Sequence, residues 1–209
     1  MDLTTATNYA NQIVTWLRPF CDRLAIAGSV RRQRPICNDI DLVVIPKFSA
    51  PPTDLFGNTA GARGVPLHAM LVNYVRDYSY QGSTGDPPVP VGDPPAVPRW
   101  QTGEHNPEGT NFILQLPKCQ LDIYIATPEN WGSKLVQRTG SKEHNTWLAS
   151  RARDLGHKWE LDRGILDQRN FLVAAETEEA IYSALSLQFI PPIAREGGLV
   201  RVSKPITDH

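Results

Sequence analysis

Several features are scarce or missing in this sequence of 209 residues. It has only three cysteines, Cys21, Cys37 and Cys119, and their odd number and wide spacing fit neither a disulfide framework nor a paired-cysteine zinc site. No run approaches the roughly 20 apolar residues of a membrane span, and the N-terminus lacks a basic flank followed by an apolar stretch. We therefore expect a soluble, intracellular protein of the cytoplasm or nucleoid that is not secreted.

The sequence also lacks a strong charge of either sign. Its formal net charge is −1, so any binding of nucleic acid has to depend on local basic patches. One patch contains Arg31, Arg32 and Arg34. A second patch spans residues 134–158 and consists of Lys134, Arg138, Lys142, Arg151, Arg153 and Lys158. Taken alone, such patches are usually solvated surface.

The first half of the chain combines a helical pattern with short apolar strands. Apolar residues at helical spacing around Ile13 predict a leading helix, and runs of branched residues predict strands over residues 24–27 and 39–45. A helix is predicted over residues 66–80. Prolines and glycines crowd residues 79–110, which excludes a helix or a central strand and predicts a long, mobile, proline-rich loop that serves as a spacer.

The second half contains a strand pair and then helix start signals. Residues 111–116 and 120–126 are expected to form an antiparallel pair. Residues 127–129, Thr-Pro-Glu, supply a cap, a first-turn proline and a first-turn acid for a helix. Ser141 and Thr177 are expected to cap two further helices.

Three carboxylates form the candidate catalytic group. Asp39 and Asp41 are one residue apart in an apolar strand, so both lie on the same face. Asp122 lies in a similar strand and completes the group if the two strands are neighbours. Hard oxygen ligands suit Mg²⁺ or Mn²⁺, and two such ions can promote phosphoryl transfer. The Asp-x-Asp pattern alone fits solvated acids equally well.

A glycine and a serine precede this group. Gly28 allows close backbone approach to a phosphate, and Ser29 offers a hydroxyl and an amide. The guanidinium groups of Arg31 and Arg32 match phosphate oxygens in geometry and charge. The pattern therefore indicates a triphosphate beside the metals, although a Gly-Ser turn alone is weak evidence.

Together these motifs resemble a known family. Residues 28–32, Gly-Ser-Val-Arg-Arg, and 39–41, Asp-Ile-Asp, resemble the palm signature of family X DNA polymerases, the group of DNA polymerase beta and bacterial polymerase X. Residues 139–145, Thr-Gly-Ser-Lys-Glu-His-Asn, resemble the nucleotide-binding segment of the family's C-terminal subdomain. Residues 189–192, Phe-Ile-Pro-Pro, with 195–196, Arg-Glu, resemble its closing segment.

The resemblance implies roles for particular residues. Asp39, Asp41 and Asp122 would be catalytic and ligate two Mg²⁺ or Mn²⁺ ions, with Asp122 also taking or orienting the proton of the primer hydroxyl. The implied nucleotide-binding residues are Gly28, Ser29, Arg32, Gly140 and Asn145. Within the second basic patch, we expect DNA contacts from Lys134, Lys142 and Arg151.

The sequence departs from the family pattern at several of these positions. Gln137 and Arg138 replace the usual Tyr-Phe before Thr-Gly, which predicts poorer discrimination against ribonucleotides. Gln120 stands where many members have arginine, and Ala149 stands where members often use an arginine to position the template. Arg151 is nearby in sequence.

We expect an α/β (α+β) protein with two subdomains. Residues 1–128 would form a nucleotidyltransferase palm with a small mixed sheet, and residues 129–209 a mostly helical thumb. This would be a minimal form of the family without the N-terminal lyase and helix-hairpin-helix domains.

The expected function is template-directed DNA polymerisation by a monomer, with deoxynucleoside triphosphates and gapped or nicked DNA as substrates, and gap filling in DNA repair as its role. One alternative is a nucleotidyltransferase that modifies a protein, an RNA or a small molecule. Another is a non-catalytic nucleic-acid-binding module.

Overall fold

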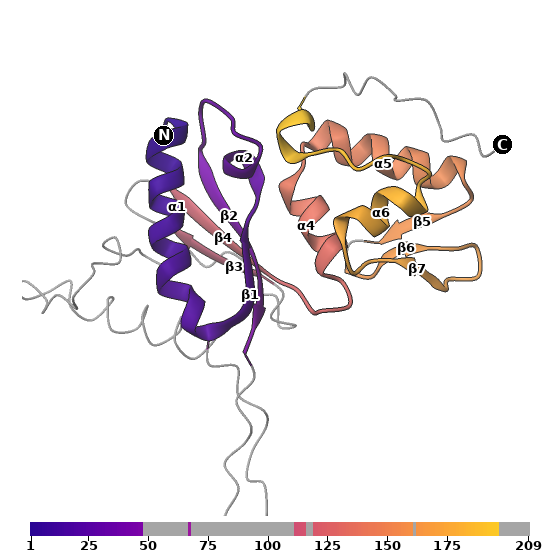
Figure 1. Cartoon of the computed structure of the whole chain (residues 1–209), viewed down its shortest axis with the longest axis horizontal. Helices are drawn as coiled ribbons and strands as arrows, with labels where there is room; N and C mark the ends of the chain where they lie inside the picture. Colours follow the sequence, from indigo (N-terminus) through magenta and orange to yellow (C-terminus); the bar gives the residue numbers. More distant parts are fainter. Residues whose placement is uncertain (48–66, 68–110, 116–118, 161, 197–209) are drawn as a thin grey trace, which may run out of the picture.

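The computed structural model describes residues 1–47, 67, 111–115, 119–160 and 162–196. These residues form two groups of elements that lie side by side (Figure 1). We call the elements within residues 1–125 the palm and those within residues 131–196 the thumb. The predicted loop at residues 79–110 lies outside the described residues. So does the predicted helix at 66–80, except for Leu67, which is helical and buried.

The palm is built on a four-stranded mixed sheet, with the strand order β1-β2-β4-β3. Its strands are β1 (Cys21–Ile26), β2 (Asp39–Pro46), β3 (Asn111–Gln115) and β4 (Gln120–Ile125). The central strands β2 and β4 are parallel, whereas the outer pairs are antiparallel. The α/β fold class with a small mixed sheet is confirmed, as is the antiparallel pairing of the third and fourth strands.

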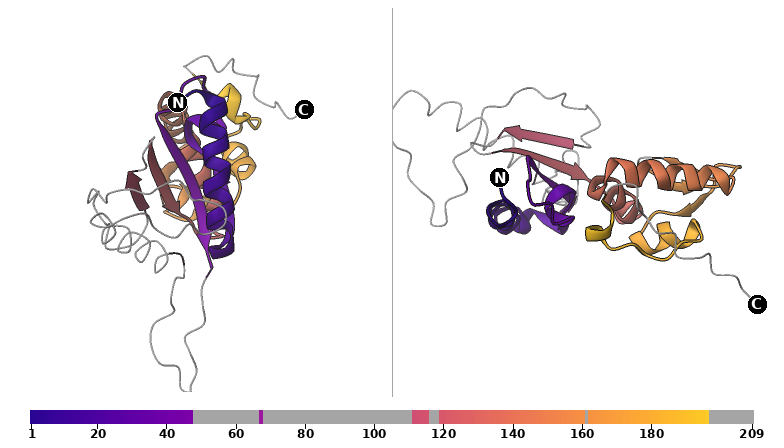
Figure 2. Two further views of the ribbon diagram at one scale, coloured as in Figure 1. Left: turned by 90° about the vertical axis from the view of Figure 1, so that its left-hand side faces the viewer. Right: turned by 90° about the horizontal axis from the view of Figure 1, so that it is seen from above.

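Helix α1 (Leu3–Leu17) covers one face of this sheet, as Figures 1 and 2 show. Asp2 caps it by accepting a hydrogen bond from the Thr5 amide at 3.0 Å. Its apolar stripe packs on side chains of β2 and β4 in the main palm core, which includes Ala6, Ala10, Ile13, Leu17, Ile40, Leu42, Val44, Leu121 and Ile123. After α1, the short helix η1 (Arg18–Phe20) leads into β1, and α2 (Gly28–Arg31) follows β1.

The opposite face of the sheet packs against the thumb. Val43 and Ile45 join Trp131 and Leu135 of α4 (Trp131–Thr139) in a separate apolar cluster. Since side chains alternate along a strand, Asp39 and Asp41 lie on the same face of β2 as Val43 and Ile45. The alternation therefore directs both carboxylates toward the thumb.

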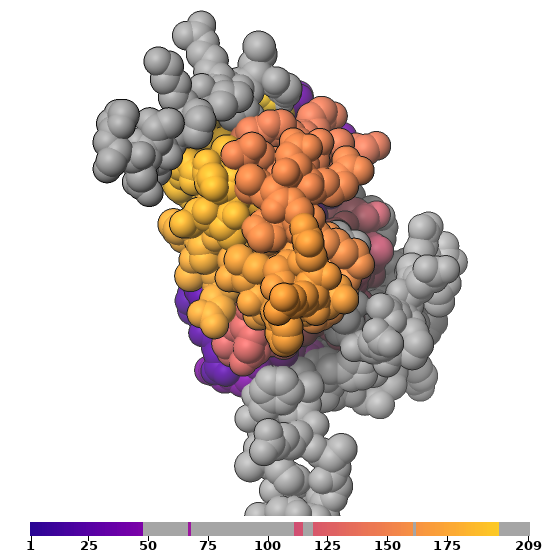
Figure 3. Space-filling model, turned by 90° about the vertical axis from the view of Figure 1, so that its right-hand side faces the viewer, coloured from indigo at the N-terminus to yellow at the C-terminus, as the bar shows by residue number. Residues whose placement is uncertain are grey.

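The thumb combines helices with a three-stranded antiparallel sheet of order β5-β6-β7. After α4 it comprises α5 (Lys142–Asp154), β5 (Lys158–Glu160), β6 (Gly164–Leu166), β7 (Leu172–Ala174), α6 (Glu178–Ala184) and η2 (Pro192–Ala194). Figure 3 shows this side of the molecule, where elements from α4 onward form most of the coloured surface. The predicted caps are confirmed, because Ser141 accepts from the His144 amide and Thr177 from the Ala180 amide.

Two expectations about the thumb need correction. Helix α4 begins at Trp131 rather than just after Thr127, because Asn130 Oδ1 accepts a hydrogen bond from the Thr127 amide and closes a turn first. The sheet β5-β6-β7 was not predicted at all, since strands of three residues are too short to show an alternating pattern.

None of the helices in the described ranges has both the length and the apolar character required to cross a membrane.

Candidate active site

The three predicted acids lie on neighbouring strands. In the parallel pair of β2 and β4, Asp41 stands opposite Asp122, and Asp39 stands opposite Gln120. Asp122 also lies on the thumb side, because its neighbours Leu121 and Ile123 point into the main palm core. The structure therefore brings the acids to one end of the two central strands, as the sequence predicted for adjacent strands.

Asp41 has a strongly raised pKa. Burial raises the pKa of its carboxyl group to about 7, and the charges of Asp39 and Asp122 contribute further. A hydrogen bond from Tyr124 and the charge of Arg32 oppose this rise only in part. The positive charge of the protein's own groups is therefore too small to hold the pKa of Asp41 at its ordinary value.

Asp122 is held by neighbours on its own strand. Gln120 Nε2 donates to Asp122 Oδ1 at 2.7 Å, and the Tyr124 hydroxyl donates to Oδ2 at 3.2 Å. Burial still raises the pKa of Asp122 above its usual value, against these hydrogen bonds. Tyr124 was not predicted as a site residue; its position two residues after Asp122, on the same strand face, was the available signal.

The donor chemistry of this cluster suits a hard divalent cation. Three carboxylates without matching positive charge, one of them with a pKa near neutrality, are the oxygen ligands that Mg²⁺ and Mn²⁺ prefer. Within the described residues, however, no three His, Cys, Asp or Glu side chains are gathered as a ready-made metal centre. Metal ligation by Asp39, Asp41 and Asp122 remains a prediction.

Gly28 and Ser29 lie directly beside the acids. Gly28 has a φ of +57°, and a Cβ at this position would lie 1.8 Å from Asp41 Oδ2, so only glycine fits. The Ser29 hydroxyl oxygen is buried and has no hydrogen-bond partner. Since buried polar groups are normally paired, this hydroxyl is suited to a polar ligand such as a phosphate.

The arginines of this segment connect the palm to the thumb. Arg31 Nη2 pairs with Glu178 Oε2 at 2.5 Å, and its Nη1 donates to Thr139 Oγ1 at 2.7 Å. Arg32 Nε pairs with Glu196 Oε1 at 2.5 Å, and its Nη1 donates to the Thr139 carbonyl oxygen. Arg32 is therefore engaged within the protein here, and a triphosphate contact would require it to exchange Glu196 for the ligand.

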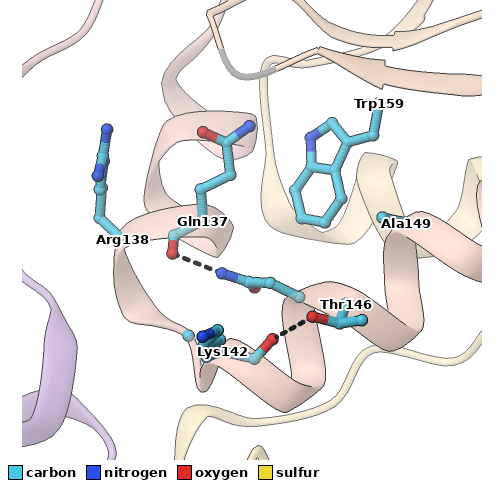
Figure 4. Close-up of a pocket in the computed structure, with 8 residues that line it drawn as sticks. Gln137, Arg138, Lys142, Thr146, Ala149 and Trp159 are labelled. Atoms are coloured by element: carbon cyan, nitrogen blue, oxygen red, sulfur yellow. Dashed lines mark hydrogen bonds between the residues drawn. The ribbon is translucent and has the colours of Figure 1, made fainter.

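A cavity of about 480 Å³ opens in the thumb (Figure 4). It is lined by Gln137, Arg138, Gly140, Lys142, Asn145, Thr146, Ala149 and Trp159. Asn145 Nδ2 donates to the Gln137 carbonyl at 2.7 Å, whereas Asn145 Oδ1 and Gln137 Oε1 are buried without partners. The predicted sugar and base contacts, Gly140 and Asn145, thus line one cavity with unpaired acceptors.

Gln137 and Arg138 are more restrained than the sequence suggested. Gln137 Nε2 donates to Ser133 Oγ at 3.3 Å. The Arg138 guanidinium lies 3.9 Å from the centre of the Tyr124 ring and lowers the pKa of Asp122, although burial of that carboxyl group dominates. Arg138 therefore links the cavity to the carboxylates, whereas the prediction of poorer sugar discrimination remains a prediction.

The predicted DNA-contact patch is not continuous. Lys134 is only 2% exposed and its ammonium group pairs with Asp162, so the prediction that it binds phosphate is wrong. Arg151 donates through Nε to the Leu185 carbonyl at 3.1 Å. It lies nine residues after Lys142, which places it about 180° around α5 from the cavity. Lys142 is exposed at the cavity, and Arg153 is exposed on the same side of α5 as Lys142.

Sequence reasoning also missed Trp159 and Glu178. Trp159 closes the cavity from β5, and its three-residue strand gave no signal. Glu178 was predicted only as a first-turn residue of α6, but it is buried and accepts from Arg31 and Arg195. Burial opposes its ionisation, yet the hydrogen bonds and charges of these arginines hold its pKa below the usual value.

Comparisons with known proteins agree with this arrangement. Residues 134–196 match the family model described as DNA polymerase beta thumb. The fold is similar to that of Leishmania infantum polymerase beta, solved as a ternary P/T complex, with a TM-score of 0.58 and 14% identity. That match covers 94% of this chain and 77% of the other. The comparison with curated proteins gave no match.

An acid-bearing mixed sheet next to a small α/β thumb is thus a fold similar to that of polymerase beta. The predicted resemblance to family X DNA polymerases is confirmed: residues 134–196 match the DNA polymerase beta thumb model, and the fold is similar to that of a polymerase beta.

Proposed function

We propose that this protein is a template-directed DNA polymerase that extends a primer 3′ hydroxyl in gapped duplex DNA. One observation carries the proposal: Asp39, Asp41 and Asp122 share the thumb-facing end of two parallel strands, beside a buried, unpaired Ser29 hydroxyl. The thumb match and the cavity at Gly140 and Asn145 support the choice of a polymerase over other nucleotidyltransferases.

In this proposal, the protein's residues hold the reactants in line. Two divalent cations, when bound to the aspartates, supply charge stabilisation for phosphoryl transfer. Ser29 and Arg32 hold the triphosphate, and Asp122, fixed by Gln120 and Tyr124, accepts or orients the proton of the primer hydroxyl. The 3′ oxygen then bonds to the α-phosphorus as the bond to the bridging oxygen breaks, and pyrophosphate leaves.

Arg32 would change partners during this cycle. In the structure it bridges to Glu196 and to the Thr139 carbonyl, which directly precedes Gly140. Moving its guanidinium to a triphosphate would free Glu196 and alter the contact between palm and thumb. Nucleotide binding and thumb position are therefore coupled in the proposed mechanism.

The test is incorporation of labelled deoxynucleotides into a one-nucleotide gapped duplex with Mg²⁺. We expect addition of the nucleotide complementary to the template, and a loss of at least about 100-fold in Asp122→Asn. Asp22→Asn, an exposed acid on β1, is the matched control and should keep full activity.

The alternatives give different results in the same assay. Addition that ignores the template base would indicate another kind of nucleotidyltransferase. Binding of DNA without any incorporation, in Mg²⁺ or in Mn²⁺, would indicate a non-catalytic module. Either outcome would overturn the proposal.

A further inference from the structure

A histidine interrupts the apolar face of α5. Leu148 and Ala152 are fully buried and belong to the same core cluster as Ile181 of α6. His144 precedes Leu148 by four residues, so it lies on the same face of the helix, and it is only 3% exposed. Apolar contacts have no preferred direction, whereas a hydrogen bond fixes both a distance and an angle. A polar contact of His144 can therefore define one placement of α5 against the rest of the thumb.

The partner of His144 is Tyr182 of α6. His144 Nε2 lies 2.7 Å from the Tyr182 hydroxyl oxygen, and Tyr182 is fully buried. Burial, together with the charge of Arg195, lowers the pKa of His144 to about 4, so the imidazole is neutral at pH 7. A buried polar pair adds little stability compared with two apolar groups of the same shape. It selects one arrangement of the helices instead, because other arrangements leave its polar atoms buried without partners.

Tyr182 is itself held firmly in place. The Arg195 guanidinium lies 5.3 Å from the centre of its ring, and Phe189 packs edge-on against the ring at 5.5 Å between centres. Glu178 lies one turn earlier on α6 and pairs with Arg31 of the palm. Helix α6 is therefore tied to the palm, and it presents a fixed hydroxyl group to α5.

His144 is joined directly to the segment that lines the cavity. The His144 amide donates to Ser141 Oγ at 3.3 Å, and the next amide, that of Asn145, donates to the Ser141 carbonyl at 2.9 Å. Gly140 directly precedes Ser141, and both Gly140 and Asn145 line the cavity. A shift of His144 would therefore also move the proposed sugar and base contacts.

We infer that His144 and Tyr182 are positioning residues, whose hydrogen bond places Gly140 and Asn145 relative to the carboxylates of the palm. The contacts run from Arg31 through Glu178 and α6 to Tyr182 and His144. Neither His144 nor Tyr182 lines the cavity, so both act through the first turn of α5. The inference rests on the proposed function, which assigns the nucleotide contacts to that turn.

The test is the double variant His144→Phe, Tyr182→Phe, which replaces the polar pair by two apolar rings. Its midpoint of urea denaturation should equal or exceed that of the wild type, because it leaves neither partner unpaired and also removes the unpaired His144 Nδ1. Amide hydrogen exchange should nevertheless show about 10-fold less protection at Asn145, equivalent to about 1.4 kcal/mol. Protection at Ala152, near the other end of α5, should not fall.

The gap-filling assay gives a kinetic measurement on the same variant. A contact made to the nucleotide in both the ground state and the transition state affects KM rather than kcat. We therefore expect the KM of the incoming nucleotide to rise about 10-fold, and kcat to stay within about 2-fold of the wild type.

Tyr9→Phe is the matched control. It also removes a buried tyrosine hydroxyl, but one that has no hydrogen-bond partner and lies in the palm core. Protection at Asn145 and the KM should not change in this variant. His144→Gln keeps a donor and an acceptor near the place of Nε2, so it should retain most of the wild-type protection and KM. Should the double variant not fold, Tyr182→Phe alone gives a second test with the same expected losses.

The outcomes separate the inference from the proposed function. If the wild type incorporates nucleotides but the folded variant keeps wild-type protection at Asn145 or a wild-type KM, only the inference is overturned. An equal loss of protection at Asn145 and Ala152 would show a general loosening of α5 and would also overturn it. A wild type that does not incorporate nucleotides would overturn the proposed function, and the inference with it.

Discussion

At the scale of single residues, the site depends on close approach. Gly28 lies so near Asp41 that any side chain would displace the carboxylate, and its positive φ disfavours other residues in addition. Asp41 is also largely buried, and burial is the main reason why its pKa rises to about 7. The packing that forms the site therefore makes the ionised form of Asp41 unfavourable.

Asp41→Asn is expected to stabilise the metal-free protein. The carboxyl group titrates at about 7 in the folded state, against an ordinary value of 3.8. Between pH 3.8 and about pH 7 the folded protein binds a proton that the unfolded protein has released. The free energy of unfolding therefore falls as the pH rises, by up to about 1.4 kcal/mol per pH unit. Asparagine carries no charge at any pH. The free energy of unfolding that Asp41→Asn gains over the wild type should therefore grow from pH 4, reach roughly 2–4 kcal/mol and level off above pH 7.

Urea denaturation at several pH values, in the presence of a chelator, measures this gain. Asp22→Asn serves as the control and should change stability little at any pH, because Asp22 is exposed. Mg²⁺ should stabilise the wild type more at pH 8 than at pH 6, and should not stabilise Asp41→Asn. A metal-free Asp41→Asn protein that is less stable than the wild type at pH 8 would refute this account of the site.

At the scale of elements, the sequence predicted what has a local pattern. The Asp-x-Asp strand, its same-face acids and the caps at Ser141 and Thr177 each follow from spacing or from a single side chain, and the structure contains them. Strands β5 to β7 have no such pattern, because each has only three residues.

Contacts distant in sequence could not be predicted from spacing at all. Glu178 lies 147 residues from Arg31, and nothing in a first-turn acid indicates a buried partner so far away. The burial of Lys134 was missed for the same reason, because a lysine in a basic run appears exposed until its helix is packed. Periodicity defines which face of an element is apolar, not what covers it.

The contact between α6 and α2 gives the second prediction. Glu178 is buried between Arg31 and the fully buried side chain of Arg195. Glu178→Gln removes the negative charge and leaves Arg195 without a counter-ion, which should cost about 3 kcal/mol in the free energy of unfolding. Thermal and urea denaturation measure this loss.

Glu179→Gln is the matched control for this variant. Glu179 is the next residue of α6, lies in the same first turn and is exposed, so both substitutions remove the same charge from the helix start. The control should lose at most about 0.5 kcal/mol. Similar losses in the two variants would mean that the ion pairs with Arg31 and Arg195 contribute no net stability.

At the scale of the whole molecule, charge limits how DNA can be held. The net charge of −1 provides no general attraction for a phosphate backbone. Several cations of the basic patches are also used internally: Arg31, Arg32 and Arg34 pair with Glu178 or Glu196, and Lys134 pairs with Asp162. Binding of DNA should therefore depend on the few exposed cations along the cavity side of α5.

The last prediction concerns the salt dependence of DNA binding. Each phosphate contact contributes about 0.9 to the slope of log affinity against log salt concentration on duplex DNA. Lys142→Ala and Arg153→Ala should each lower this slope by about that amount, because both side chains are exposed on the cavity side of α5. Arg151→Ala should leave the slope unchanged, since Arg151 lies on the opposite side of the helix and donates to the Leu185 carbonyl. Arg163→Ala is a further control, as this exposed arginine is bonded to Glu160 and Asn170, outside α5. A slope that falls equally in all four variants would show that DNA is not localised on the cavity side of α5, and this model of DNA binding would have to be abandoned.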